Sequence, residues 1–485
     1  ITRAGGLILC PELLIAEHFT LDKVTLHGPE IRFIFKQRLG DLQVTLFAKI
    51  YNKIREREGL QKVLKNTLWL FYDRFFRMGF SLIVGALLAR YLAPSLYGVF
   101  NYAFSFVALF AVLGSLGLDN ILIREMVKSP DKENIFLGTA FLLKLAGGFL
   151  IVIFSVGVIV LTKPNDPLSQ ALVLIVAAGY VLQSVNVIDL YFQSRIKSKY
   201  TVISSNAAFI VSSAAKLTCI FFKASLIVFA WLYIAEIVIS AFGLLIFYHR
   251  LGRKIKLWQF DQKVAVNLLR DSWPLILSGA AIMIYMRIDQ VMVGNMLGNV
   301  ALGLYSSAVK IAEVWYFIPM AIVSSTFPSI LEAKKREDRA YTGRMQLQYH
   351  ILFLSSFLIC LVLSLFSKNI IFMLYGAEYI GASSVLSIYV WAGVAVSLGV
   401  ASNQYLISEN FTKVSLLRTI IGCIANVILN LVLIPRYGIE GSAWATFISY
   451  FISVFSILMF KETKAHGVLL LKSLNPFKIL FKTER

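Results

Sequence analysis

The chain has 485 residues, of which 58% are apolar, and its mean hydropathy is +0.74. This apolar share exceeds the roughly 45–50% of average soluble domains and indicates a polytopic membrane protein. The formal net charge of +20 does not indicate nucleic-acid binding, because Lys and Arg fall in short segments between apolar runs, where they orient helices and meet anionic headgroups.

Residues 1–60 differ from everything that follows. They are charged, mixed in pattern and without an apolar run near 20 residues, and Gly5–Cys10 is too short for the apolar region of a signal peptide. We therefore expect an N-terminal extension outside the fold, so that a chain starting near Tyr51 would still insert and transport.

From Lys65 onward the sequence predicts twelve apolar helices, each long enough to cross a bilayer at about 1.5 Å per residue. The expected spans are 67–90, 99–118, 135–162, 168–192, 203–222, 225–248, 271–294, 301–330, 349–374, 383–407, 413–435 and 438–460. The predicted fold is an all-α polytopic membrane protein with two six-helix lobes. We expect these lobes at 65–248 and 271–460, with a connector at 249–270 and a tail at 461–485.

Two stretches, one in each half, repeat the same pattern. Ala89–Ala103 reads ARYLAPSLYGVFNYA and Gly294–Ala308 reads GNMLGNVALGLYSSA, with Leu92/Leu297, Gly98/Gly303, Phe100/Tyr305 and Ala103/Ala308 in register. A second repeat links Tyr191–Lys199 with Tyr405–Lys413, where Tyr, Ser and Lys recur at the same spacing. Internal duplication of membrane helices is typical of alternating-access transporters.

The distribution of basic residues predicts the orientation in the membrane. Assigning alternate connections to opposite sides places 35 of the 47 Lys and Arg residues on one side and 5 on the other. The positive-inside rule therefore puts both termini and the 249–270 connector in the cytoplasm. The five basic residues predicted outside are Arg90, Lys163, Lys223, Lys368 and Arg436.

Charged residues inside the predicted spans are the candidate functional residues, because exposing one to lipid near the midplane costs roughly 2.5–3.5 kcal/mol or more. The basic ones, candidates for substrate binding, are Arg74, Arg77, Lys144, Lys216, Arg287, Lys310 and Arg418. The acidic ones, candidates for coupling or ion pairing, are Asp73, Asp189, Glu236, Asp289 and Glu313.

Some of these charges can neutralise one another within a helix. Asp73 with Arg77 and Lys310 with Glu313 have the spacing of structural ion pairs, which leaves a purely structural interpretation open for them. Arg287 and Asp289 point about 200° apart on a helix, so their partners must lie elsewhere. The surplus of base predicts a cavity for an anion such as a phosphate or diphosphate, with Arg287 as a principal contact.

No feature of the sequence indicates an enzyme, a cofactor or a metal. The four cysteines, Cys10, Cys219, Cys360 and Cys423, lack C-x-x-C spacing, so neither a zinc site nor a disulfide framework is indicated. The five histidines lie outside or at the edges of the predicted spans, so none supplies a buried base.

Five motifs, in order over Lys65–Lys461, resemble the polysaccharide flippases of the multidrug/oligosaccharidyl-lipid/polysaccharide exporter superfamily, most closely the O-antigen repeat-unit flippases. The motifs are Ala89–Pro94 with Tyr97-Gly98, Leu116–Glu125, Ser272–Leu275, Asp289–Gly294, and Asn426–Pro435 followed by Gly438–Thr446. Ala93 departs from the glycine that this family usually has before the proline, which puts the local turn geometry in question.

The resemblance implies a twelve-helix, two-lobed transporter that moves undecaprenyl-diphosphate-linked oligosaccharides across the bacterial cytoplasmic (inner) membrane for O-antigen or other surface polysaccharides. Its implied partners are that lipid, the membrane lipids, and polysaccharide polymerase and chain-length machinery. The competing interpretations are a cation-coupled multidrug exporter of the same superfamily, which should have an acid-dominated cavity, and a membrane oligosaccharide polymerase, which should have a large external loop.

Overall fold

The computed structural model describes residues 58–335 and 340–475, in which every regular element is a helix. The chain divides into two units after Lys65. The predicted extension at 1–60 lies almost wholly outside the described residues, and the following description concerns Asn66–Arg485.

The first half of this unit is a set of packed helices. Its elements are α2 (Glu58–Ala108), α3 (Val112–Ser115), α4 (Asp119–Lys128), α5 (Glu133–Thr162), α6 (Pro167–Leu182), α7 (Val187–Ser194), α8 (Lys199–Phe221) and α9 (Leu226–Arg250). Helix α5 packs on α6, α6 on α9, and α8 on α9. The 3-10 turn η2 (Gln183–Asn186) joins α6 to α7, so these two short helices together follow the predicted span 168–192.

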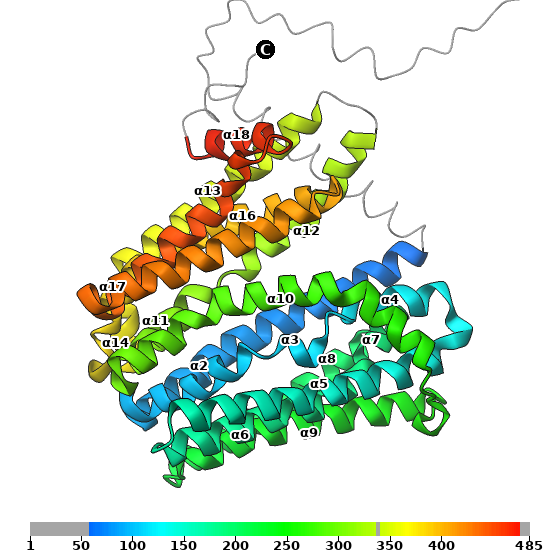
Figure 1. The fold of residues 1–485 in the computed structure, drawn as a ribbon, viewed down its shortest axis with the longest axis horizontal. Coiled ribbons are helices and arrows are strands. Elements are labelled where there is room, and N and C mark those ends of the chain that lie inside the picture. Colours follow the sequence, from blue (N-terminus) through cyan, green and yellow to red (C-terminus); the bar gives the residue numbers. More distant parts are fainter. Residues whose placement is uncertain (1–57, 336–339, 476–485) are drawn as a thin grey trace, which may run out of the picture. The chain divides into compact units, whose positions relative to one another are not determined.

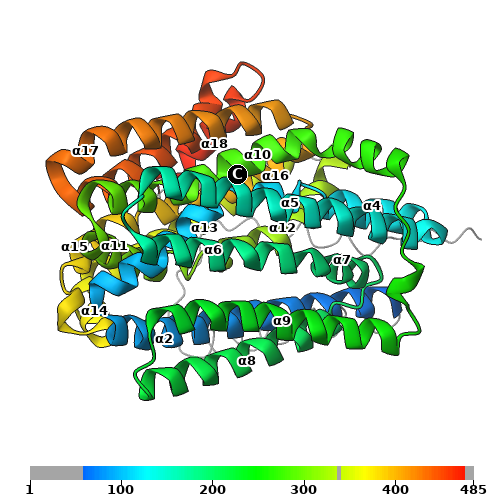
Figure 2. The ribbon, with the colours of Figure 1, turned by 60° about the horizontal axis from the view of Figure 1, so that its bottom comes forward.

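The second half repeats this organisation. Its elements are α10 (Gln262–Leu297), α11 (Asn299–Glu313), α12 (Phe317–Lys335), α13 (Ala340–Leu365), α14 (Ser367–Tyr375), α15 (Ala382–Tyr389), α16 (Ala392–Ser408), α17 (Thr412–Phe455) and α18 (Lys464–Ser473). Helices α13 and α17 pack on α16, and α10 packs on α17. In both views α8 and α9 lie on the opposite side of the bundle from α17 (Figures 1 and 2).

Helix α10 connects the two halves. Its first turns are capped by Asp261, whose carboxylate accepts from the Val264 amide at 2.9 Å, and they contact α4 and α5 of the first half. The remainder packs on α11 and α17 of the second half. The helix begins within the predicted connector 249–270, because its polar first turns extend beyond the apolar run from which a span is recognised.

The duplication predicted from the sequence is confirmed by matching backbone geometry. Ala93 has φ 56° and ψ 168°, and its counterpart Gly298 has φ 86° and ψ −179°. A Cβ built on Gly98 would lie 1.8 Å from the Asn299 carbonyl oxygen, and one built on Gly303 would lie 2.0 Å from the Pro94 carbonyl oxygen. The two segments therefore cross each other reciprocally, which only glycine allows at this separation.

The second repeat also forms the same structure twice. Ile196 and Asn410 both end a helix with positive φ, at 55° and 61°. The Ser194 hydroxyl donates to the Tyr191 carbonyl at 2.8 Å, and the Ser408 hydroxyl donates to the Tyr405 carbonyl at 2.9 Å. The same turn therefore precedes α8 and α17.

Ten helices in the described residues are long and apolar enough to cross a membrane. Two of them contain a non-helical residue, Ala93 between the predicted spans 67–90 and 99–118 in α2, and Gly438 at the start of the predicted span 438–460 in α17. The arms of α17 run antiparallel, since Asn426 donates to Ser449 and Ser442 donates to Asn430 (Figure 1). The helical membrane fold is as predicted, and the count of twelve spans stays a prediction.

The last described helix, α18, docks on α13 through an aromatic contact. His466 is buried, lies 2.5 Å from the Tyr349 hydroxyl and stacks on Tyr405. Burial lowers the pKa of His466 to about 3, so the side chain is neutral at pH 7 and this docking introduces no buried charge.

Candidate functional site

A cavity of 990 Å³ lies between the two halves and is called here the central cavity. Its walls come from α2, α8 and α9 of the first half and from the end of α11 in the second. The charged residues that line it are Arg77, Lys216, Lys310, Glu236 and Glu313, all predicted from the sequence as candidate site residues.

Lys310 projects from α11 toward α2. Its ammonium donates to the Tyr97 hydroxyl at 3.3 Å and lies over the Tyr97 ring. It also lies 3.1 Å from where a Cβ on Gly85 would stand, so the glycine makes room for it. The anticipated ion pair with Glu313 is not formed, and no described carboxylate lies within salt-bridge distance of Lys310.

Arg77 lines the central cavity from α2, with its guanidinium over the Phe209 ring at 5.8 Å. It pairs with none of the carboxylates whose side chains the structure describes. The predicted pair of Arg77 with Asp73, and the position of the Arg74 side chain, fall on the part of α2 whose side chains lie outside that description.

Both carboxylates that line the central cavity form salt bridges with basic side chains. Glu236 of α9 accepts from Lys216 of α8 at 3.0 Å. Glu313 accepts from Arg287 of α10 at 3.2 Å, and its other oxygen accepts from the Tyr389 hydroxyl at 3.2 Å. Lys310 and Arg77 are therefore not offset by either acid, and the central cavity retains an excess of positive charge.

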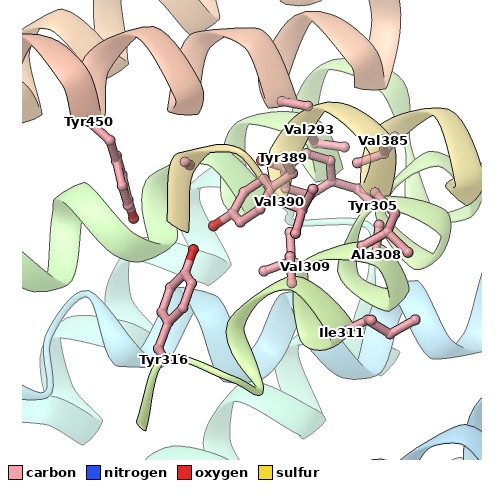
Figure 3. Packing of buried hydrophobic residues seen from close by; sticks show 14 of the residues in the cluster. Val293, Tyr305, Ala308, Val309, Ile311, Tyr316, Val385, Tyr389, Val390 and Tyr450 are labelled. Carbon is pink, nitrogen blue, oxygen red and sulfur yellow. The ribbon is translucent and has the colours of Figure 1, made fainter. Parts of the chain in front are cut away.

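The Arg287–Glu313 pair lies among tyrosines of the second half. Tyr316, Tyr389 and Tyr450 are buried on three different segments, and their hydroxyl groups point toward a common space (Figure 3). The side chains of Arg287 and Glu313 are 29% and 17% exposed. Partial exposure and several hydroxyl dipoles reduce the desolvation penalty of this ion pair.

Asp289 lies on a different face of α10 from Arg287, as the sequence predicted. It is buried and accepts from the Tyr305 hydroxyl at 2.6 Å, from the Gln290 amide at 2.7 Å and from Thr446 at 3.4 Å. It therefore fastens α10 to α11 and α17 inside the second half, away from the residues that line the central cavity.

Arg418 is buried within the second half as well. It donates to the Ser402 hydroxyl at 3.0 Å and to the Gly399 carbonyl at 3.1 Å. These bonds join α17 to α16, and Arg418 does not line either cavity described here.

A second cavity, of 370 Å³, lies in the first half against α10 and is called here the side cavity. Lys144, Asp119 and Asp189 line it. Lys144 pairs with Asp119, and Asp189 accepts from Gln193 at 3.0 Å and from Thr201 at 2.7 Å. Nowhere in the two described stretches do three or more His, Cys, Asp or Glu side chains form a metal-binding group.

Residues 63–334 match the family of polysaccharide biosynthesis proteins. The chain belongs to this family. The matched range includes every residue that lines the central cavity, and the MatE family matches residues 274–432. The chain is a multi-pass membrane transporter of the superfamily known as MOP.

Relatives and solved structures agree with this family. A "probable low-salt glycan biosynthesis flippase Agl15" of Haloferax volcanii is 22% identical over 400 residues, covering 80% of each chain. Among solved structures, the lipid II flippase MurJ in an inward closed conformation has a TM-score of 0.63 at 17% identity, covering 87% of this chain and 93% of that one. An inward-facing multidrug resistance MATE transporter also has a TM-score of 0.63, at 15% identity over 84% and 96%. These structures share the two-lobed fold.

Two polar cavity residues of this polysaccharide biosynthesis protein were not predicted from the sequence. Asn101 and Tyr233 are uncharged, and nothing in their spacing distinguishes them from packing residues. Asp119, the partner of Lys144, lies 25 residues away from it. Asp119 belongs to the motif Leu116–Glu125, and membership of this motif was the one sign in the sequence that Asp119 could belong to a site.

Proposed function

We propose that the protein is a flippase that carries lipid-linked oligosaccharides across the cytoplasmic membrane by alternating access. The cargo would bear a phosphate or diphosphate between its sugars and a polyprenyl chain. The undecaprenyl carrier, an O-antigen product, the bacterial inner membrane and the polymerase partners remain predictions from the resemblance. The glycan role in the name of the Haloferax volcanii relative supports the broader proposal.

The observation that carries this proposal is the unpaired base in the central cavity. Lys310 from the second half and Arg77 from the first face the same space, while both lining carboxylates already hold cations. A phosphate entering the cavity would therefore meet a net positive potential contributed by both halves. Lys310 and Arg77 are the proposed direct contacts, and Arg287 contributes by neutralising Glu313.

Contacts between the halves support alternating access. The Arg90 guanidinium donates to the Leu374 carbonyl at 2.9 Å, and the Tyr379 hydroxyl donates to the Ala89 carbonyl at 2.8 Å. These contacts, with the crossing at Gly98 and Gly303, lie at the end of the bundle predicted to face outside. In this conformation the central cavity would be loaded from the cytoplasmic side.

Lys310→Gln tests the proposal in proteoliposomes that hold the full chain and a fluorescent polyprenyl diphosphate carrying a saccharide. We expect at least a tenfold slower transfer between leaflets, because a charge-assisted contact contributes about 1.5–3 kcal/mol. Lys368→Gln, the same substitution at an exposed lysine outside the cavity, should transport at the wild-type rate. Equal rates for Lys310→Gln and wild type would refute the cationic cavity.

Multidrug export is the second candidate function. The MatE match and the MATE structure favour it, and Glu236 and Glu313 line the central cavity. In the same proteoliposomes, a lipophilic cation should neither be transported nor slow the lipid-linked saccharide if the cavity serves anions. Transport of the cation, lost in Glu236→Gln, would support the exporter instead.

A further inference from the structure

The side cavity has the character of a binding site for a neutral, hydroxyl-rich group. Besides its three charged residues it is lined by Ser115, Tyr180, Gln183, Ser184 and Asn186. Its volume of 370 Å³ lies within the range of about 300–1,000 Å³ that small-molecule sites occupy. It is formed mainly by α3, η2 and α7, with Gly279 and Met283 of α10 on one side.

Several polar groups in this cavity have no hydrogen-bond partner among the described residues. The Tyr180 hydroxyl, the Ser184 hydroxyl and the Asn186 amide are the three side chains that are free in this sense. Gln183 uses its amide nitrogen to donate to the Tyr233 hydroxyl at 3.1 Å, so its oxygen remains free. Hydroxyls and amides offer both donors and acceptors, and these match the hydroxyl groups of a sugar.

The charges of the side cavity disfavour a phosphate there. Lys144 is neutralised by Asp119, and Asp189 adds a carboxylate, so the lining carries a formal excess of one negative charge. The central cavity carries the opposite excess, since Arg77, Lys216 and Lys310 face Glu236 and Glu313. A ligand with an anionic and a neutral part would place the anion centrally and the neutral part at the side.

A hydrogen bond joins the linings of the two cavities. Gln183 lines the side cavity, and Tyr233, which accepts its amide hydrogen, lines the central cavity. A group bonded to a phosphate that lies beside Tyr233 would stand next to the wall formed by this hydrogen bond. Replacement of the Gln183–Tyr233 bond by bonds to the ligand would open the wall without leaving either side chain unpaired.

We infer that the side cavity binds the saccharide next to the phosphate of the transported lipid, with Tyr180, Gln183, Ser184 and Asn186 as its hydrogen-bonding residues. This inference rests on the proposed function and adds to it a physical basis for preferring glycosylated over bare lipid carriers. The Tyr180 ring offers an apolar face beside its hydroxyl, which suits the apolar face of a sugar ring.

Two substitutions test the inference without altering the central cavity. Tyr180→Phe removes only a free hydroxyl, and Asn186→Ala removes a free amide from an exposed position, so neither should impair folding. Asn165→Ala is the matched control, because Asn165 is exposed in the loop before α6 and makes no described hydrogen bond. Each variant is the full chain in proteoliposomes.

The measurement is the ratio of two transfer rates between leaflets. One substrate is the lipid-linked oligosaccharide extracted from the cells that carry this chain, and the other is the corresponding bare polyprenyl diphosphate. Loss of one neutral hydrogen bond costs about 0.5–1.5 kcal/mol. Each variant should therefore lower the transfer rate of the glycosylated lipid about two- to tenfold and leave the transfer rate of the bare lipid unchanged. The Asn165→Ala ratio should equal that of wild type.

The outcomes distinguish this inference from the proposed function. If Tyr180→Phe and Asn186→Ala leave the ratio of rates unchanged while wild type transports the glycosylated lipid, the side cavity holds only water and the inference is wrong. If wild type transports neither lipid, the proposed function fails and the inference fails with it. Lys310→Gln should slow both lipids equally and so separates the phosphate site from the saccharide site.

Discussion

Two ion pairs that reach the central cavity join charged side chains on neighbouring helices instead of within one helix. Lys216 and Glu236 are 20 residues apart, and Arg287 and Glu313 are 26 apart. Helical spacing predicts only pairs three or four residues apart, so it correctly separated Arg287 from Asp289 but could not name Glu313. The same spacing predicted an ion pair between Lys310 and Glu313. This pair does not form, because α10 packs against α11 and brings Arg287 to Glu313.

At this scale we predict that Arg287 acts through Glu313. Arg287→Ala should reduce transport of the lipid-linked saccharide strongly, because it leaves an unpaired carboxylate inside a cavity meant for an anion. Breaking a buried pair costs about 3–5 kcal/mol, and the partial exposure of both side chains lowers that value here. Adding Glu313→Gln removes the stranded charge, so the double variant should recover most of the wild-type transport rate.

The conservative variant Arg287→Lys provides the control for charge alone, and should retain part of the transport because a point cation still neutralises Glu313. Membrane levels of all variants are measured alongside transport. A double variant as inactive as Arg287→Ala, at a normal membrane level, would show that Arg287 contacts the cargo directly, as the sequence alone suggested.

Apolar runs predicted the elements well, but not their interruptions. The predicted span 301–330 is divided between α11 and α12, and 383–407 between α15 and α16. These breaks occur in apolar sequence, where hydropathy contains no signal. The interruption at Ala93 did have a signal in the sequence, because the resembling family usually has glycine at this position. The backbone there has positive φ.

Element geometry therefore makes Ala93→Gly a stabilising substitution. With φ 56° and ψ 168°, Ala93 occupies a region that is essentially restricted to glycine, and such positions store about 1–3 kcal/mol. We expect the free energy of unfolding to rise by about 1 kcal/mol, seen as a higher thermal midpoint of the detergent-solubilised protein. The helical Ala86→Gly, as matched control, should lower that free energy by about 1 kcal/mol. A lower midpoint for Ala93→Gly would show that Ala93 is not strained.

On the scale of the whole molecule, the structure gathers the chain connections at two ends. Arg90 donates a hydrogen bond to the Leu374 carbonyl of α14, and the Tyr91 hydroxyl donates to the Ala224 carbonyl beside Lys223. Lys163 lies over the Tyr102 ring. These contacts bring together the segments predicted to lie outside. At the other end Glu133 holds Arg195 and Arg253, both of which were assigned to cytoplasmic connections. These contacts agree with the predicted alternation for the connections named here, and the direction in the membrane stays a prediction from charge.

The orientation is the prediction that belongs to this scale. Single cysteines introduced into a cysteine-free chain at Lys256 in the connector and at Ala465 in α18 should react with a membrane-impermeant maleimide only after the cells are opened. Cysteines at Lys368 and Arg436 should react in intact cells, because all four positions are exposed and the 35-to-5 asymmetry of Lys and Arg places the first two in the cytoplasm. Labelling of Lys256→Cys or Ala465→Cys in intact cells, with Lys368→Cys protected, would show that the chain has the opposite orientation in the membrane. The end sealed by Gly98 and Gly303 would then face the cytoplasm, and the central cavity could not be loaded from that side in this conformation.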